Sequence, residues 1–241
     1  MVGQGIAMQD VKDFPIKGFL ETSFVDWHGK ICSVIVFSRC NFRCRYCHNA
    51  DLVLRSDALE NISFDQILTR LEELKGWVDG VCVSGGEPTL HECLPEIMRA
   101  IKSAGFLTKL DTNGSNPVVL ERLLADGLID YVAMDVKSCL DEDSYCRITQ
   151  APQMLAGVKK SIKMLMGGQV AYEFRCTVVP SVHERDDIYK MAKALNGAKR
   201  LRIQNFSPSE SLLDPALKVV KPFSEQDIDA MQSRVDKLIA Q

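Results

Sequence analysis

The sequence predicts an α/β protein built on a parallel sheet. Apolar, β-branched runs alternate with helix-length amphipathic segments six times along the chain. No low-complexity linker or break in composition interrupts the alternation, and 241 residues with 46% hydrophobic side chains are enough to bury a full core. Regular alternation implies right-handed crossovers between parallel strands, in a sheet that is either doubly wound or curled into a barrel.

Each expected element has its own signal. The strands are short runs rich in Val, Ile, Phe and Cys at residues 31–38, 80–84, 107–111, 131–136, 171–179 and 200–206. The helices are amphipathic segments at residues 63–76, 90–104, 117–126, 152–167, 184–196 and 223–239. Ser63 and Gln66 predict a capping box for the first helix, and Gly76 predicts its end. We expect a single domain over residues 1–241, with a core from about 18 to 208 and a helix at about 223–239 after it.

Composition excludes several classes of function. The net charge of −3 gives no basic field, so nucleic acid is not an expected partner. The first residues lack the apolar stretch of a signal peptide, and no segment approaches eighteen apolar residues, so we expect a cytoplasmic protein with no membrane contact. In a reducing compartment, nine cysteines do not form a disulfide framework.

Three of the nine cysteines are clustered. Cys40, Cys44 and Cys47 have the spacing C-x3-C-x2-C, directly after the first expected strand. Cys82 and Cys176 lie inside strand-like runs, where a free cysteine behaves as a small hydrophobic residue. The remaining four show no spacing typical of ligands, and we expect none of them to bind metal: Cys32, Cys93, Cys139 and Cys146.

A three-cysteine loop lacks the fourth ligand of a closed metal site. A zinc site is one alternative, with a histidine as the fourth ligand: His48, His28, His91 or His183. The spacing lies outside the usual zinc patterns, and His48 is adjacent to Cys47, which makes it hard for both to reach one ion. The other alternative is a four-iron cluster held by three thiolates, which leaves one iron open to substrate.

Further polar motifs follow the other strands. Gly85–Pro88 (GGEP) follows the second strand, Asp111–Gly114 (DTNG) ends the third, and Asp135 with Lys137 ends the fourth. Arg175 lies in the fifth strand and the segment QNFSP follows the sixth. The carboxyl ends of parallel strands share one edge of the sheet, so we expect these residues around one active site together with the cysteine loop.

The motifs together resemble a known family. The loop C-x3-C-x-aromatic-C, with Tyr46 as the aromatic residue, resembles that of the radical S-adenosylmethionine superfamily, and CNFRCRYCHN resembles its glycyl-radical-enzyme activating branch. SGGEPTL, LDTNG and AMDVK follow in the order of that branch, over nearly the whole chain from Gly18 to Pro208. The resemblance is to the anaerobic ribonucleoside-triphosphate reductase activating proteins and to their pyruvate formate-lyase counterparts. With six units instead of eight, we expect a partial (β/α)6, open TIM-like barrel.

The resemblance implies one [4Fe–4S] cluster on Cys40, Cys44 and Cys47 and S-adenosylmethionine as cofactor. It implies that Glu87 accepts a hydrogen bond from the cofactor's amino group and that Gly85 and Gly86 allow its close approach. It assigns cofactor contacts also to the residues Tyr46, Asn113, Lys137 and Arg175. A monovalent cation is implied beside the cofactor, held by Asp111, Thr112, Asp135 and the carbonyl of Ala133. After the sixth strand the chain departs from the pyruvate formate-lyase branch, because Phe206 and Ser207 stand where that branch has a histidine.

The function implied is reductive cleavage of S-adenosylmethionine, followed by formation of a glycyl radical on a partner enzyme. The expected partner is an anaerobic ribonucleoside-triphosphate reductase, with a pyruvate formate-lyase-type enzyme as the alternative. The chain has no room for a flavin or nicotinamide domain, so the electron donor is expected to be an external flavodoxin or ferredoxin. Two further alternatives stay open: a small-molecule radical enzyme related to 7-carboxy-7-deazaguanine synthase, and a zinc-stabilised interaction module.

Overall fold

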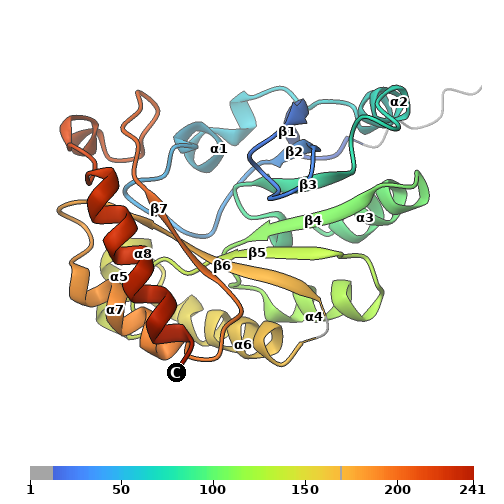
Figure 1. The fold of residues 1–241 in the computed structure, drawn as a ribbon. Helices are drawn as coiled ribbons and strands as arrows, with labels where there is room; N and C mark the ends of the chain where they lie inside the picture. The colour runs from blue at the N-terminus through green and yellow to red at the C-terminus, as the bar shows by residue number, and fades with distance from the viewer. Residues whose placement is uncertain (1–12, 169) are drawn as a thin grey trace, which may run out of the picture.

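The computed structural model describes residues 13–168 and 170–241, which form one seven-stranded sheet flanked by helices (Figure 1). The strands lie in chain order, and every neighbouring pair from β2 to β7 is parallel. Their bounds are β1 Ile16–Ser23, β2 Cys32–Phe37, β3 Gly80–Gly85, β4 Leu107–Thr112, β5 Tyr131–Asp135, β6 Ala171–Val178 and β7 Leu201–Asn205. β1 and β7 occupy opposite ends of the order, so the sheet is an open, partial barrel, as predicted.

The first strand was not predicted. β1 pairs with β2 in the antiparallel direction, and its register shifts between Ile16 and Gly18 and again between Leu20 and Ser23. These irregularities break the alternation of buried and exposed residues that marks a strand in a sequence. All six predicted strands are present as β2 to β7, and no bound differs from its prediction by more than one residue.

The six predicted helices are also present. They are α2 Phe64–Glu73, α3 Leu94–Ser103, α4 Pro117–Ala125, α6 Leu155–Met166, α7 Arg185–Ala194 and α8 Glu225–Ile239. Two short helices were missed, α1 Ala50–Leu54 and α5 Glu142–Thr149, because five to eight residues hold too few turns to show a periodic pattern. The predicted capping box of α2 is wrong: Ser63 is the N-cap, but its side chain makes no capping hydrogen bond.

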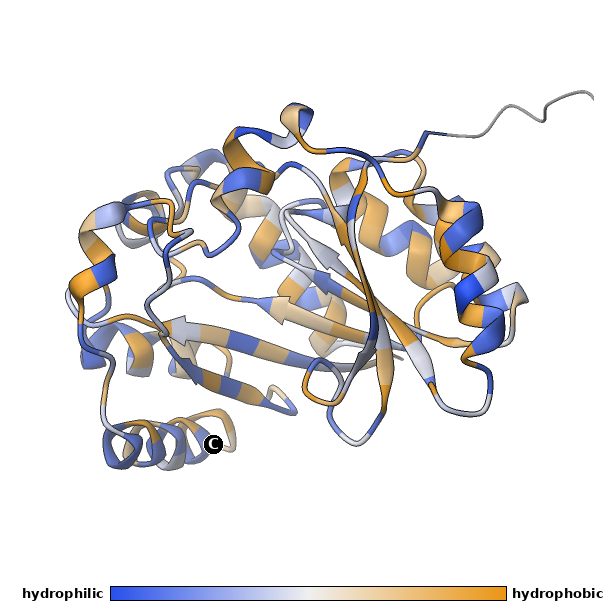
Figure 2. Ribbon diagram, turned by 90° about the horizontal axis from the view of Figure 1, so that it is seen from above, coloured by the Kyte–Doolittle hydropathy of each residue, from blue (hydrophilic) through white to orange (hydrophobic). Residues whose placement is uncertain are grey.

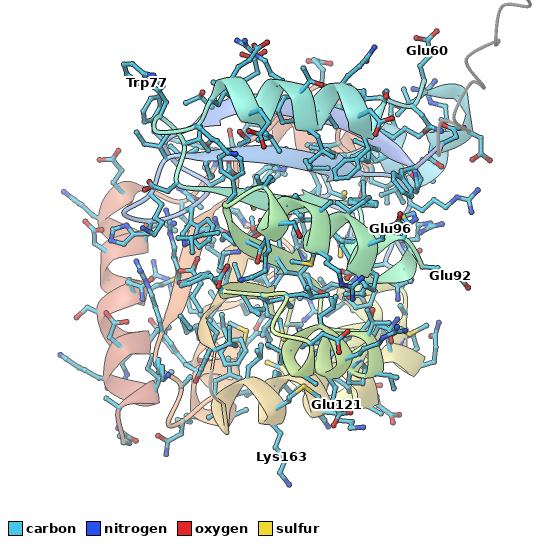
Figure 3. All side chains as sticks on the ribbon, turned by 90° about the vertical axis from the view of Figure 1, so that its right-hand side faces the viewer. Glu60, Trp77, Glu92, Glu96, Glu121 and Lys163 are labelled. Atoms are coloured by element: carbon cyan, nitrogen blue, oxygen red, sulfur yellow. The ribbon has the colours of Figure 1, made fainter. Side chains whose placement is uncertain are left out.

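The helices cover the outer face of the sheet. α2, α3, α4 and α6 lie one below another on one side, where the labelled side chains of Trp77 and Lys163 point away from the sheet (Figure 3). Hydrophilic and hydrophobic residues alternate along these helices, as expected where one face packs on a core (Figure 2). α8 lies beside β7 and α7 at one end of the sheet (Figure 1).

The amino-terminal end of the inner face carries aromatic residues. Trp27, from the connection between β1 and β2, is 5% exposed and packs with Cys32, Val34 and Cys82. Its ring lies 5.9 Å from that of Tyr131 on β5. Cys82 and Cys176 are buried in the core as predicted. In the part of the chain that the structure describes, no helix combines the length and apolar character needed to cross a membrane.

Candidate functional site

A cavity opens at the carboxyl ends of the strands, where the sequence motifs were expected to meet. It encloses about 890 Å³ of space, a volume that includes its open mouth. Twelve of the fourteen predicted site residues line it: Cys40, Cys44, Tyr46, Cys47, Gly85, Gly86, Asp111, Thr112, Asn113, Asp135, Lys137 and Arg175. Glu87 and Ala133 do not.

Backbone contacts shape the loop that carries the three cysteines. Arg39 begins it with a φ of +58°, an uncommon conformation for a residue with a side chain. The Cys47 N–H donates to the Cys44 carbonyl over 2.9 Å, and Arg43 Nη1 donates to the Cys40 carbonyl over 2.5 Å. From the far end of the chain, the Leu213 N–H donates to the Cys47 carbonyl over 3.0 Å. The loop is therefore held by hydrogen bonds within itself and by a hydrogen bond from a segment distant in sequence.

The surroundings of the thiols act on the thiolate form in opposite directions. Burial raises the pKa of Cys40 to about 11 and that of the fully enclosed Cys44 to about 12. The backbone N–H of Phe42 lies 3.4 Å from the Cys40 sulfur, and Nδ2 of Asn113 lies 3.9 Å from it. Positive charge from Lys137 also favours the thiolate form of both cysteines. Buried thiols of this kind lose their protons when a metal takes the proton's place.

The described residues contain no compact site for a single metal ion. Across residues 13–168 and 170–241, no group of three or more His, Cys, Asp or Glu side chains is gathered closely enough to hold a single metal ion. Three of the four candidate histidines instead have Nε2 between 2.5 and 2.9 Å from a backbone carbonyl oxygen: His48, His91 and His183. The loop offers three separate thiols, which fits a four-iron cluster whose irons each take a different thiolate.

The glycines after β3 lie against the chain that leads into the cysteine loop. A Cβ atom on Gly86 would stand 1.7 Å from the Arg39 carbonyl oxygen, and one on Gly85 would stand 2.3 Å from that of Phe37. Gly85 also has a φ of +125°, which residues with a side chain rarely adopt. Because both glycines line the cavity, they leave its wall made of backbone at this point.

Glu87 lies behind this wall and is fully buried. Oε1 accepts from the Thr112 hydroxyl over 2.7 Å and from the N–H and hydroxyl of Thr89 over 3.2 and 2.5 Å. Oε2 accepts from the Asn113 N–H over 2.7 Å. Burial raises the pKa of the carboxyl group, against the effect of these hydrogen bonds. In the structure the carboxylate joins the ends of β3 and β4 and does not line the cavity, and the predicted contact of Glu87 with a cofactor stays a prediction.

Amide side chains join the β4 tip to the cysteine loop. Nδ2 of Asn113 donates to Oδ1 of Asn41 over 2.9 Å, and Nδ2 of Asn41 donates to the Ser115 hydroxyl over 2.8 Å. The Ser115 N–H donates back to Oδ1 of Asn113 over 2.9 Å. Glu87 and this triad therefore connect β3, β4 and the cysteine loop into one hydrogen-bonded unit.

Charged residues form a continuous chain along the inner face. Lys109 contacts Asp111, Arg175 Nη2 lies 3.2 Å from Asp111 Oδ2, and Arg175 Nε lies 2.9 Å from Asp135 Oδ1. Lys137 Nζ closes the chain 2.9 Å from Asp135 Oδ2. Burial alone would raise the pKa of Asp135, but Arg175 and Lys137 hold it well below its usual range. Three cations thus face two carboxylates, and the network carries one net positive charge.

Beside β7 the cavity has no histidine from the segment after that strand, where the pyruvate formate-lyase branch has one. Phe206 is buried, and its ring lies 5.9 Å from that of His48 with 26° between the planes. Nε2 of His48 lies 2.5 Å from the Ser207 carbonyl oxygen. A histidine is therefore present at the mouth, but it comes from the cysteine loop rather than from the segment after β7.

Six residues that line the cavity were not predicted: Phe42, His48, Asn49, Val53, Ser84 and Thr177. Ser84 and Thr177 could have been found, because each lies two residues from another residue on the inner face, Cys82 and Arg175, and side chains alternate along a strand. Val53 belongs to the unpredicted helix α1 and had no signal of its own.

Comparison with known proteins gives a consistent family match. A family model described as the radical SAM superfamily matches residues 34–202. A Methanocaldococcus jannaschii protein, provisionally named a glycyl-radical enzyme activating enzyme, is 34% identical over 211 residues, which cover 86% of each chain. The pyruvate formate-lyase-activating enzyme of Clostridium pasteurianum is 28% identical over 214 residues, which cover 86% of this chain and 87% of the relative.

Solved structures show a similar fold. The crystal structure of Streptococcus suis SuiB bound to S-adenosylmethionine matches with a TM-score of 0.65 at 16% sequence identity. The match covers 86% of this chain and 49% of SuiB, so the chain spans about half the length of that protein. At this identity the likeness concerns the fold, and it supports the open, partial barrel.

Proposed function

The chain belongs to the radical S-adenosylmethionine superfamily, and from that membership we propose that it activates a partner enzyme by generating a glycyl radical on it. The observation that carries the proposal is the convergence at one cavity of the three thiols of Cys40, Cys44 and Cys47, the glycine wall after β3 and the positively charged network. Relatives over 86% of the chain bear names of activating enzymes of this kind.

A [4Fe–4S] cluster on the three cysteines would pass one electron to S-adenosylmethionine, whose cleavage yields methionine and a 5′-deoxyadenosyl radical that takes a hydrogen atom from glycine Cα. The protein's share of this chemistry is binding, orientation and exclusion of water. The one net positive charge of the network would offset the carboxylate of the cofactor, through the cavity-lining Lys137 and Arg175. The bare backbone at Gly85 and Gly86 would allow the methionyl part to approach closely.

The proposed partner is an anaerobic ribonucleoside-triphosphate reductase, with a pyruvate formate-lyase-type enzyme second. The stack of Phe206 on His48 supports the reductase as the first candidate. Phe206 follows β7 at the place where the pyruvate formate-lyase branch has a histidine. The electron would come from an external flavodoxin or ferredoxin. The sheet is open, with β1 and β7 at its two edges, and a loop of a protein substrate could reach the cavity through its mouth.

Electron paramagnetic resonance tests the proposal directly. Reduced, cluster-loaded protein is mixed with S-adenosylmethionine and each candidate partner, and a glycyl radical doublet is expected on the partner. The doublet should change when the partner's glycine is α-deuterated, and Cys44→Ala protein should give none. If no glycyl radical enzyme of the same organism develops the doublet while a small molecule drives cofactor cleavage, the activase proposal fails.

A further inference from the structure

An ammonium group lies buried beside the cavity. Lys109 on β4 is 0% exposed, and its Nζ forms an ion pair with Oδ1 of Asp111, two residues further along the same face. Nζ also lies 3.6 Å from the Cys82 sulfur on β3. The ion pair with the Asp111 carboxylate stabilises the charged form of this ammonium group. Lys109 was not among the predicted site residues.

The oxygens expected to hold a monovalent cation already have partners. In Asp111, Oδ1 contacts Lys109, while Oδ2 lies 3.2 Å from Arg175 Nη2 and 3.3 Å from the Ser84 hydroxyl. In Asp135, Oδ1 accepts from Arg175 over 2.9 Å and Oδ2 accepts from Lys137 over the same distance. Neither carboxylate presents an oxygen without a cationic partner, and an added cation would face three positive groups.

The third expected ligand is also occupied. The Thr112 hydroxyl donates to Oε1 of Glu87 over 2.7 Å and accepts from the Gly114 N–H over 3.1 Å. Its hydrogen and its oxygen are therefore both committed within the β4 tip. The three side chains expected to bind a monovalent cation, those of Asp111, Thr112 and Asp135, are thus committed to other groups of the protein and do not fit that role.

We propose that the Lys109 ammonium takes the place of the monovalent cation, and that this protein binds its cofactor without added K⁺ or Na⁺. Lys109 is a positioning residue: it neutralises Asp111 from below, which leaves Arg175 shared between Asp111 and Asp135. Removing it would leave Asp111 short of one cation and free the volume that a monovalent ion could fill. The part of this inference that concerns S-adenosylmethionine rests on the proposed function.

The neighbouring strand leaves room for the lysine. Ala133 on β5 is the register partner of Asp111, and its side chain is a single methyl group. Tyr131 is the partner of Lys109 itself and closes the inner face below it, together with Trp27. A four-carbon side chain that rises from the level of Tyr131 therefore brings its ammonium group to the level of the Asp111 carboxylate.

The first test uses the wild-type protein. S-adenosylmethionine binding to cluster-loaded protein is measured by calorimetry in KCl, NaCl and tetramethylammonium chloride at one ionic strength. We expect dissociation constants that agree within twofold. An affinity at least tenfold weaker in tetramethylammonium chloride would overturn the proposal, because it would show that a small cation is required.

The second test uses two variants without cluster or cofactor. Lys109→Ala opens space beside Asp111, so its thermal midpoint should rise by several degrees when KCl replaces tetramethylammonium chloride. Lys109→Met is the matched control: its side chain fills the space without charge, so K⁺ should give no such rise. The thermal midpoint of the wild-type protein should likewise be the same in both salts. A thermal midpoint of Lys109→Ala that does not change with K⁺ would contradict the proposal. If this variant does not fold, the calorimetric comparison of the wild-type protein in the three salts decides.

The two proposals fail in different ways. If the protein binds no S-adenosylmethionine in any salt, the proposed function is wrong, while the melting series still reports on Lys109. If binding occurs but needs K⁺, only the role of Lys109 is wrong. In the cluster-loaded Lys109→Ala protein, K⁺ should restore S-adenosylmethionine affinity at least fivefold, an effect that a merely structural lysine would not give.

Discussion

The Thr112 hydroxyl donates to Oε1 of Glu87 over 2.7 Å and so joins the tips of β3 and β4 directly behind the cavity wall. The same carboxylate accepts the Asn113 N–H over 2.7 Å, and Asn113 in turn reaches the cysteine loop through Asn41. A buried carboxylate that accepts hydrogen bonds from four donors holds these segments together. Its removal should therefore lower the stability of the protein and also disturb the geometry of the site.

Glu87→Gln tests this role of the carboxylate. The amide keeps the size of the side chain but turns one acceptor into a donor that faces an N–H or a hydroxyl, so unfolding free energy should fall by about 1–3 kcal/mol. Urea denaturation measures the change, and Glu121→Gln on the exposed face of α4 is the control. Equal midpoints for Glu87→Gln and wild type would show that the carboxylate does not hold the two tips.

Gly86→Ala tests the packing of the β3 tip. The added Cβ would stand 1.7 Å from a backbone oxygen of Arg39, so one of the two chains must move. We expect a loss of about 1–3 kcal/mol of stability, the usual cost of overpacking, together with weaker S-adenosylmethionine binding. Gly167→Ala is the control, because its Cβ would lie 3.4 Å from the Lys163 oxygen, an ordinary van der Waals distance. Similar melting curves for the two variants would argue against the close approach.

The cluster prediction separates two kinds of buried cysteine. Reconstituted wild-type protein should hold about four irons per chain, and Cys40→Ala, Cys44→Ala or Cys47→Ala should each lose most of them. Cys176→Ala, in the core and away from the cavity lining, should keep the iron and lower only the thermal midpoint. Iron and sulfide analysis gives the answer; full iron content in all three loop variants would refute the assignment.

The lowered pKa of Asp135 predicts that the folded protein loses stability at low pH. Its pKa in the folded protein lies below the ordinary 3.8, so below that pH the unfolded chain binds more protons than the folded one. The free energy of unfolding should therefore fall as the pH drops below about 4. Asp135→Asn should flatten this acid limb but cost about 3–5 kcal/mol at pH 7, because Arg175 and Lys137 lose their partner.

Denaturation series between pH 3 and pH 7 test this prediction. Asp229→Asn, at an exposed position on α8, is the control for loss of a single surface carboxylate. Parallel acid limbs for wild type and Asp135→Asn would place the acid sensitivity on other groups. Salt should weaken the effect little, since Asp135 lies within an enclosed network.

Strong periodic patterns made most of the fold predictable. The strands β2 to β7 are runs of buried residues, and six helices show a clear apolar face, so all twelve could be found from the chain alone. β1 was missed because its shifts of register mix buried and exposed residues. α1 and α5 were missed because they are short and depend on tertiary contacts more than on their own pattern.

The position of the site was predictable for a topological reason, but the hydrogen bonds and ion pairs within it were not. Parallel strands bring their carboxyl ends to one edge, so the motifs met as expected. Which polar groups satisfy one another depends on distances between strands, and this is why Glu87 faced Thr112 and Asn113 rather than the cavity. Lys109 was overlooked for the same reason, since within a strand-like run nothing distinguishes an ion-paired lysine from an exposed one.

The contacts around Arg45 set an order of events in the making of the protein. Its guanidinium pairs with Asp214, 169 residues further along the chain, and its carbonyl accepts the N–H of the same residue over 2.9 Å. A ribosome releases the cysteine loop long before this segment. Until the segment around Asp214 has been synthesised, the cysteine loop therefore lacks the contacts that hold Arg45 in the folded protein.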